Sequence, residues 1–399
     1  MLNSNGGFFI LKKFAVWALA FALVITLAFT PGLASTKSSI KLVVDGQEVK
    51  LDAQPTLEDG RILIPLRGLF EQAGLRVDWD GAKKAATVTN GYTTIVLKEN
   101  TKQAQVDGKN VNLDVAAKTQ NGRMYIPARF IAETVGFKVD YKSEVVNITT
   151  NRVKDTDAFI QKSMETDLNS YSATMNIDQT MRASSMADAE MKMSMRMKMD
   201  ATQNPLALYM KMSMDISMDG EKESIPEIES YFTNDGFYQF DPMSSEWVKY
   251  DDELMQEMLE ELMNQADPLS QFEELRKYLK NIQVYEYADH YIMSFSLADN
   301  YLNEMMGGLG DLLGEEIGEL PFKVNYFEFS TKLDKKTLYP IDLVGKSHLY
   351  GDIEGEKLNI YQSISGKYSN YNKINEITIP EDVLKNAKSF EEMYSDLGL

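Results

Sequence analysis

The segment Gly60-Arg61-Ile62-Leu63-Ile64-Pro65-Leu66-Arg67 returns 62 residues later as Gly122-Arg123-Met124-Tyr125-Ile126-Pro127-Ala128-Arg129. Further matches keep the same order: Val44-Asp45-Gly46 with Val106-Asp107-Gly108, Leu51-Asp52 with Leu113-Asp114, and Gly74-x-x-Val77-Asp78-Trp79 with Gly136-x-x-Val139-Asp140-Tyr141. So many ordered matches indicate one structural unit used twice. One copy is too small to bury a core alone, so we expect the two copies to share one core.

Each copy carries local signals for strands around a short helix. Asp-Gly between alternating apolar residues predicts a two-residue hairpin, with strands near 40–44 and 47–52 in the first copy. A proline in the Ile-Pro-x-Arg segment begins the helix, and Gly74 or Gly136 fits its left-handed end. A last strand is expected at 86–89 or 145–149. We expect alternating residues after each glycine to point inward: Leu75, Val77 and Trp79, and Phe137, Val139 and Tyr141.

The doubled pattern V-D-G, G-R-x-x-I-P-x-R and G-[FL]-x-V-x-[WY] resembles the copper amine oxidase N-terminal-like domain over about residues 38–150. That family is a stalk module found on secreted proteins of Gram-positive bacteria. The resemblance implies an α+β fold, here a duplicated ββαββ stalk, without catalytic residues. It does not imply copper, because the module lies apart from the catalytic domain in the oxidases.

Amine oxidase chemistry does not fit this chain. The copper site of that kind takes three His ligands, whereas this chain has only His290 and His348. The Tyr that matures into the quinone cofactor stands in an Asn-Tyr-Asp/Glu sequence, which neither Asn300-Tyr301-Leu302 nor Asn370-Tyr371-Asn372 provides. We therefore expect no metal, no cofactor and no amine oxidase activity, with both His residues lying in strands or loops of a Tyr-rich sheet.

Residues 1–34 have the pattern of a secretory signal peptide. Lys12 and Lys13 precede an apolar run over 14–29, and Gly32 and Ala34 supply small residues for cleavage before Ser35. An uncleaved membrane anchor is the alternative, since the apolar run approaches a spanning length. We expect a secreted or cell-envelope protein. The chain has no Cys, and therefore neither a lipoprotein attachment site nor a disulfide.

The chain is strongly acidic, with a formal net charge of −19. Loss of residues 1–34 would remove two Lys and no acid. Such a chain repels phosphate backbones and anionic lipid surfaces, so we expect no nucleic-acid partner.

After a short polar linker at 151–156 and a helix at 157–167, the composition changes to long alternating strands. Methionine occupies every second position of one run and nearly every second position of another, with Ile216 completing the second pattern. Strict alternation of this length predicts antiparallel strands with one wet and one apolar face. The methionines are Met191, Met193, Met195, Met197 and Met199, then Met210, Met212, Met214 and Met218.

The rest of the second half reads as one antiparallel sheet with inserted helices. Strands are expected at 230–232, 236–240, 247–250, 282–297, 322–333, 338–349 and 357–369, with helices at 254–263 and 270–279 and a last short helix from Ile379. This topology resembles the LolA/LppX-like carrier fold, a half-barrel wrapped around helices, over about residues 155–390. We take the half-barrel domain to span residues 155–399.

Two functions of different class remain open. No catalytic motif is present, and paired acids such as Glu260-Glu261 are most simply solvated helix faces, so we expect a noncatalytic protein. The nine methionines would line an apolar cavity for a lipid or other apolar molecule, with the Gly-rich segment 305–314 at its rim. They would instead be filler between sheet and helices if the protein is a structural or interaction protein of the envelope, with its stalk docking on cell wall or a surface protein.

Overall fold

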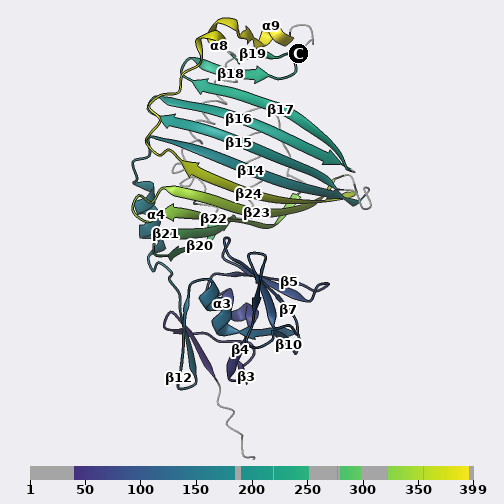
Figure 1. The fold of residues 1–399 in the computed structure, drawn as a ribbon, viewed down its shortest axis with the longest axis vertical. Helices are drawn as coiled ribbons and strands as arrows, with labels where there is room; N and C mark the ends of the chain where they lie inside the picture. Colours follow the sequence, from purple (N-terminus) through teal and green to yellow (C-terminus); the bar gives the residue numbers. More distant parts are fainter. Residues whose placement is uncertain are drawn as a thin grey trace, which may run out of the picture.

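The computed structural model describes residues 40–394, apart from 185–189, 219, 251–275, 277–278, 298–321 and 354. The expected signal peptide, nearly all of both inserted helices and the Gly-rich segment 305–314 therefore lie outside the described residues. The end expected for the second helix is wrong, because Leu279 begins a strand, β20 (Leu279–Glu286). The described chain forms two parts, an N-terminal module (residues 40–150) and a large curved sheet that follows it (Figure 1).

The N-terminal module contains three small sheets around two short helices, α2 (Leu66–Phe70) and α3 (Ala128–Thr134). The first sheet is ordered β12 (Lys138–Lys142), β13 (Val145–Thr149), β1 (Lys41–Val44) and β2 (Gln47–Glu48). The second is ordered β5 (Arg76–Asp80), β6 (Ala85–Thr89), β7 (Thr94–Lys98), β8 (Gln103–Val106) and β9 (Lys109–Asn112). The third is ordered β10 (Lys118–Gln120), β11 (Arg123–Pro127), β4 (Arg61–Pro65) and β3 (Thr56–Glu58).

The two sequence copies interlock. Ile64 of β4 lies opposite its own counterpart Ile126 of β11, and β1 of the first copy runs parallel to β13 of the second. One buried cluster contains residues of both copies, which confirms the shared core. Two reciprocal ion pairs of 2.7 Å cross between the copies: Arg61 Nε to Asp114 Oδ2, and Arg123 Nε to Asp52 Oδ2.

The predicted turns are confirmed. Asp45 and Gly46 have φ of 50° and 83°, and Asp107 and Gly108 have φ of 50° and 78°, as a two-residue hairpin requires. Each helix begins directly after its proline, Pro65 or Pro127, and is followed by a glycine at positive φ. The short strands β3, β4, β7, β10 and β11 were not predicted, and the strand expected at 47–52 is only Gln47–Glu48.

The expected burial of Trp79 and Tyr141 is wrong, since these side chains are 42% and 47% exposed. Leu75 and Phe137, which directly follow the glycines, are buried as expected. The reason is that β5 and β12 are edge strands, whose far ends extend past the core. Alternation therefore predicts which side of a strand a residue is on. It does not predict how far along that side the hydrophobic core extends.

The large sheet has twelve strands in the order β20-β21-β22-β23-β24-β14-β15-β16-β17-β18-β19-β25. Ten of them are β14 (Ser170–Ala183), β15 (Met191–Gln203), β16 (Leu206–Met218), β17 (Glu221–Thr233), β18 (Gly236–Asp241), β19 (Glu246–Tyr250), β22 (Phe322–Asp334), β23 (Pro340–Ile353), β24 (Glu356–Ser369) and β25 (Lys388–Ser389). The expected strand 282–297 is instead a hairpin of β20 (Leu279–Glu286) and β21 (His290–Leu297), because the chain turns at 287–289. The expected strand 230–232 is the end of the longer β17.

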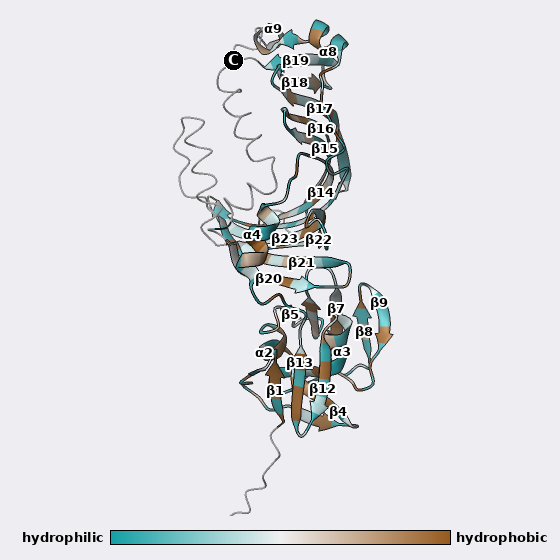
Figure 2. Ribbon diagram, turned by 90° about the vertical axis from the view of Figure 1, so that its left-hand side faces the viewer, coloured by the Kyte–Doolittle hydropathy of each residue, from teal (hydrophilic) through white to brown (hydrophobic). Residues whose placement is uncertain are grey.

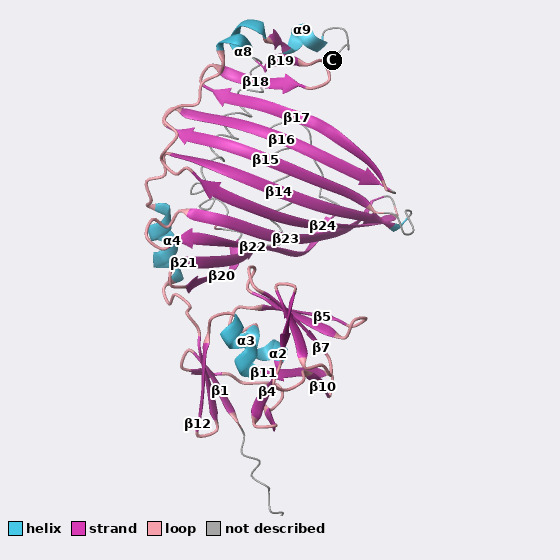
Figure 3. Cartoon of the chain, in the orientation of Figure 1, coloured by secondary structure: helices cyan, strands magenta, loops and turns pink. Residues whose placement is uncertain are grey.

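The sheet bends into a half-barrel, and α4 (Thr156–Met164) lies at the concave side of its lower end (Figure 2). Phe159 and Ile160 of this helix pack with Val284 of β20 and Met293 of β21. At the other end of the sheet lie α8 (Glu381–Asn386) and α9 (Phe390–Tyr394) (Figure 3). The described chain therefore has the expected mostly β architecture of an α+β protein.

The two parts are joined along the edge strand β20. The Val153 amide donates to the Val284 carbonyl at 2.8 Å, and the Glu286 amide donates to the Asn151 carbonyl at 2.7 Å. Tyr285, between these contacts, is 1% exposed and belongs to the buried core of the N-terminal module. The short linker at 151–156 thus makes the two parts close neighbours.

Candidate functional site

The methionine runs lie on two neighbouring strands, and their register sets them side by side. In the pairing of β15 with β16, methionine lies opposite methionine at four of five positions, and Met193 lies opposite Ile216. The four pairs are Met191 with Met218, Met195 with Met214, Met197 with Met212, and Met199 with Met210. Because directly opposed residues project to the same side of a sheet, all nine predicted residues share one face.

This face continues onto strands that are distant in sequence. On β14, Met175, Ile177 and Met181 lie opposite Met197, Met195 and Met191, and the polar Gln179 lies opposite Met193. On β24, Ile364 and Ile360 lie opposite Ile177 and Met181. On β17, Ile228 and Ile225 lie opposite Met212 and Met214. We call this apolar surface of β24, β14, β15, β16 and β17 the methionine face.

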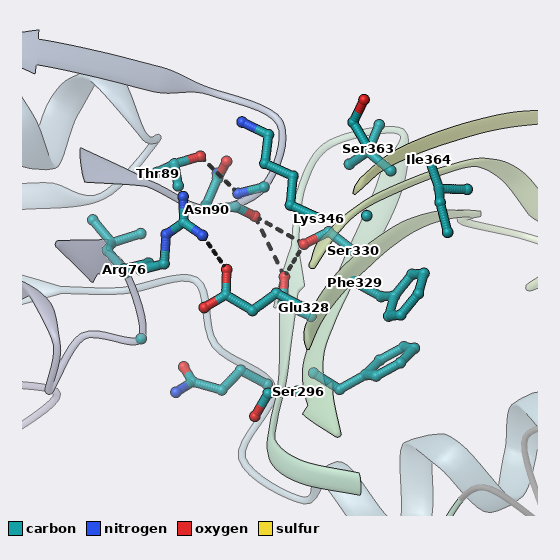
Figure 4. Close-up of a pocket in the computed structure, with 18 of the residues that line it drawn as sticks. Arg76, Thr89, Asn90, Ser296, Glu328, Phe329, Ser330, Lys346, Ser363 and Ile364 are labelled. Carbon is teal, nitrogen blue, oxygen red and sulfur yellow. Dashed lines mark hydrogen bonds and ion pairs between the residues drawn. The ribbon is translucent and has the colours of Figure 1, made fainter. Parts of the chain in front are cut away.

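The methionine face is the concave face of the half-barrel. Strand β22 alternates between the two sides: Glu328 and Ser330 turn toward the N-terminal module, whereas Phe329 turns away from it (Figure 4). Register then connects Phe329 through Gly345 and Ile364 to Ile177, and Ile177 to Met195. Since α4 also packs on the side away from the N-terminal module, the methionines face the concavity seen in Figure 2.

The predicted methionines are neither fully buried nor freely exposed. Eight of the nine are half-buried, and Met218, at the free end of the strands, is 48% exposed. At the opposite end Met199 and Met210 pack against a buried cluster that includes Tyr171, Leu208 and Phe237. The face therefore runs from a packed aromatic end to an exposed end.

The convex face of the same strands is a network of charges. Asp215 receives a hydrogen bond from Ser224 and ion pairs from Lys222 and Arg196, and these contacts lower its pKa to about 2. Lys211 pairs with Glu229 and Glu227 at 3.1 and 3.3 Å. The strands are thus apolar inside and wet outside, as strict alternation predicts.

A second candidate site lies where the N-terminal module meets the convex face. This pocket of about 500 Å³ is lined by Arg76, Asn90 and Gly91 of the module and by Glu328 and Lys346 of the sheet, together with apolar residues that include Leu75 and Val344. Figure 4 shows Arg76 and Asn90 on the module side of the pocket and Glu328 and Lys346 on the sheet side. The sequence does not reveal this pocket, because it exists only once two distant segments dock. We call it the inter-module pocket.

The described residues contain no group of three or more His, Cys, Asp or Glu that could hold a metal ion. His290 stacks on Tyr287 with 4.8 Å between ring centres, and His348 stacks on Tyr361 at 4.3 Å. Both are strand residues in aromatic surroundings, the position expected from the sequence. In the same part of the chain, no helix is long and apolar enough to cross a membrane.

Comparison with known protein families assigns both parts of the chain. Residues 156–388 match the family of unknown function DUF6612. This chain belongs to the DUF6612 family. Residues 43–150 match the copper amine oxidase N-terminal domain, which confirms the first resemblance. A curated relative from Brevibacillus choshinensis, named protease inhibitor, is 26% identical over 105 residues, and the match spans 26% of this chain and 32% of that protein.

Three solved structures similar to this DUF6612 chain are remote in sequence, with 7–10% identity. Lipovitellin, from a study of its lipid–protein interactions, aligns with 7% identity and a TM-score of 0.30, over 54% of this chain and 27% of that one. A LolA superfamily protein from Nitrosomonas europaea aligns with 10% identity and a TM-score of 0.18, over 57% of this chain and 96% of that one. A β-barrel-like DUF1849 protein from Brucella abortus aligns with 9% identity and a TM-score of 0.18, over 51% of this chain and 99% of that one.

Proposed function

We propose that this protein is a noncatalytic binding protein whose half-barrel takes a lipid or another apolar molecule against the methionine face. The observation that carries the proposal is the half-buried state of eight methionines on one concave surface. Methionine side chains are flexible and polarizable, so a surface built from them adapts to ligands of varied shape.

Packing alone is a weaker explanation for this composition. Core-facing positions of a sheet are usually filled by β-branched and aromatic residues, which fit the pleated surface better. Here isoleucines occur on the flanking strands, as Ile177, Ile225, Ile228 and Ile364, beside Met175 and Met181 of β14, whereas the centre on β15 and β16 is almost entirely methionine. A change from stiff to flexible side chains toward the centre of the face suits a ligand site.

We further propose that residues 1–34 direct export and that the mature protein acts at the envelope of a Gram-positive cell. The apolar run at 14–29 with small residues before Ser35 supports export. The charge of −19 supports solubility outside the cell and disfavours nucleic acid.

A structural or interaction role is the second candidate. The observation in its favour is the firm docking of the N-terminal module, which places Tyr285 of the large sheet inside the module's core. Such a rigid rod would suit a spacer between the cell wall and a surface protein. Inhibition of a protease, suggested by the name of the Brevibacillus relative, would be another form of this role.

Binding of a fluorescent fatty acyl probe to the full chain tests the proposal. We expect the wild type to bind the probe and the double change Met195→Gln with Met212→Gln to weaken binding at least tenfold. The control double change, Lys198→Gln with Ser213→Gln, places the same amides on the convex face of the same strands and should leave binding unchanged. The structural role predicts instead that neither wild type nor variant binds, while buried unpaired amides cost about 1–3 kcal/mol each.

A further inference from the structure

The inter-module pocket lies on the opposite face of the sheet from the methionine face and is chemically different. One side is a cross-strand row of polar residues. Register places these side by side on β21, β22, β23 and β24: they are Ser296, Glu328, Lys346 and Ser363. Because two of the four are serines, the row leaves room above the sheet, and the pocket is within the size range of ligand sites at domain interfaces.

The N-terminal module lies over this row of residues, and hydrogen bonds to the sheet fix the distance between them. The Asn90 carbonyl accepts hydrogen bonds from Ser330 Oγ at 3.3 Å and from Ser294 Oγ at 3.4 Å. The Tyr92 hydroxyl donates to Asp342 Oδ1 at 2.5 Å. At Gly91, with φ of 93°, an added Cβ would lie 2.0 Å from Ser330 Oγ, so only glycine permits this approach. The pocket is therefore preformed, since these contacts hold its two sides in place.

Some charged groups around the pocket form ion pairs and others do not. Arg76 pairs with Glu328 at 2.5 Å and with Asp78 at 2.9 Å. Burial raises the pKa of Glu328, although Arg76 acts in the opposite direction. Lys346 makes no ion pair within the described part of the chain, and its side chain extends along the pocket (Figure 4). The pocket thus offers the charged groups of Glu328 and Lys346 and the hydroxyl of Ser363, beside apolar lining residues such as Val344.

These groups exclude two classes of ligand. An apolar molecule would remove water from Glu328 and Lys346 without replacing their hydrogen bonds. The lining carries two carboxylates, Glu71 and Glu328, and two cations, Arg76 and Lys346, so it has no net positive charge to attract a polyanion. A sugar avoids both difficulties, because each hydroxyl both donates and accepts. We propose that the inter-module pocket binds a short uncharged oligosaccharide.

Isothermal titration of the full chain with neutral di- and trisaccharides, among them diacetylchitobiose, cellobiose and maltose, tests this proposal. Ser363→Leu would fill the pocket from the sheet side, and Lys346→Met would remove the ammonium donor and keep the stem. Neither change touches the contacts that hold the module in place. We expect the first to abolish binding and the second to weaken it about tenfold. Lys198→Met, on the same convex face but outside the pocket, is the matched control and should bind as wild type.

Two negatively charged analogues of the tightest-binding saccharide, one phosphorylated and one a uronic acid, are titrated in the same way. We expect both to bind more weakly than the neutral saccharide. Sedimentation with purified cell-wall glycan separates the two sources of such a ligand: retention indicates a wall glycan, and saccharide binding without retention indicates a free sugar. The proposal is overturned if no neutral saccharide binds, if the anionic counterparts bind better, or if Ser363→Leu binds like wild type with an unchanged melting temperature.

Discussion

Replacement of Tyr285 probes how the two parts of the molecule depend on each other. This residue belongs to β20 of the large sheet, yet its ring lies 5.8 Å from that of Phe137 in the core of the N-terminal module. Its hydroxyl donates to the Ala73 carbonyl at 2.5 Å, and its side chain is 1% exposed. A change in one part should therefore destabilise the other.

The magnitude follows from what each substitution removes. Tyr285→Ala deletes a buried aromatic ring, which typically costs about 3–5 kcal/mol when the site cannot collapse. Tyr285→Phe keeps the ring but leaves the Ala73 carbonyl without its donor, at a cost of about 1–3 kcal/mol. Tyr350→Ala is the control, because this tyrosine of the same sheet is 43% exposed and its loss should cost about 0.5 kcal/mol or less.

Hydrogen exchange followed by mass spectrometry reports where the stability is lost. We expect Tyr285→Ala to increase exchange in β6, β13 and α3 of the N-terminal module as well as in β20 and β21, with Tyr285→Phe giving a smaller change in the same places. Increased exchange confined to β20 and β21 would refute the claim that the two parts depend on each other, because the core of the N-terminal module would then be stable without Tyr285.

Three further predictions concern surface, backbone and pH. Trp79→Ala should lower the free energy of unfolding by about 1 kcal/mol or less in urea denaturation, since the side chain is 42% exposed; a loss above about 3 kcal/mol would show that it is internal. Gly91→Ala should destabilise the protein more than Gly108→Ala in the same assay. Both glycines have positive φ, but only the first would place a Cβ against Ser330, whereas Gly108 has open space; equal losses would contradict the close approach. Asp215 has a pKa lowered from 3.8 to about 2, so its stabilising effect is present above pH 3.8 and lost as the pH falls to about 2. Melting temperatures should therefore fall less between pH 5 and pH 2 in Asp215→Asn than in wild type, and parallel curves would be the contrary result.

The sequence predicts those features that depend on local chemistry or on a repeated period. Asp45-Gly46, Pro65 and Gly74 each need a particular backbone conformation, so the turn, helix start and helix end can be placed from residue type alone. The alternation of Met191 to Met199 likewise predicts the strand and its apolar side. Neither inference requires knowledge of distant contacts.

Features that arise from docking are not visible in the sequence. The polar pocket residues on the sheet are serines, a lysine and a glutamate within ordinary strands, and nothing in their spacing distinguishes them from solvated positions. Tyr285 likewise appears as one of many strand tyrosines until β20 meets the N-terminal module. The exposure of Trp79 has the same origin, because the extent of the core depends on which strands become edges.

The most direct test of the proposed function is photo-crosslinking of the full chain with a fatty acyl probe that carries a reactive group along its chain, followed by peptide mapping. We expect labelling of peptides from β15 and β16 at residues 191–199 and 210–218, with loss of labelling when unlabelled fatty acid is added in excess. Labelling confined to residues 89–92 and 328–346 around the inter-module pocket, or no label that excess fatty acid displaces, would contradict an apolar site on the methionine face.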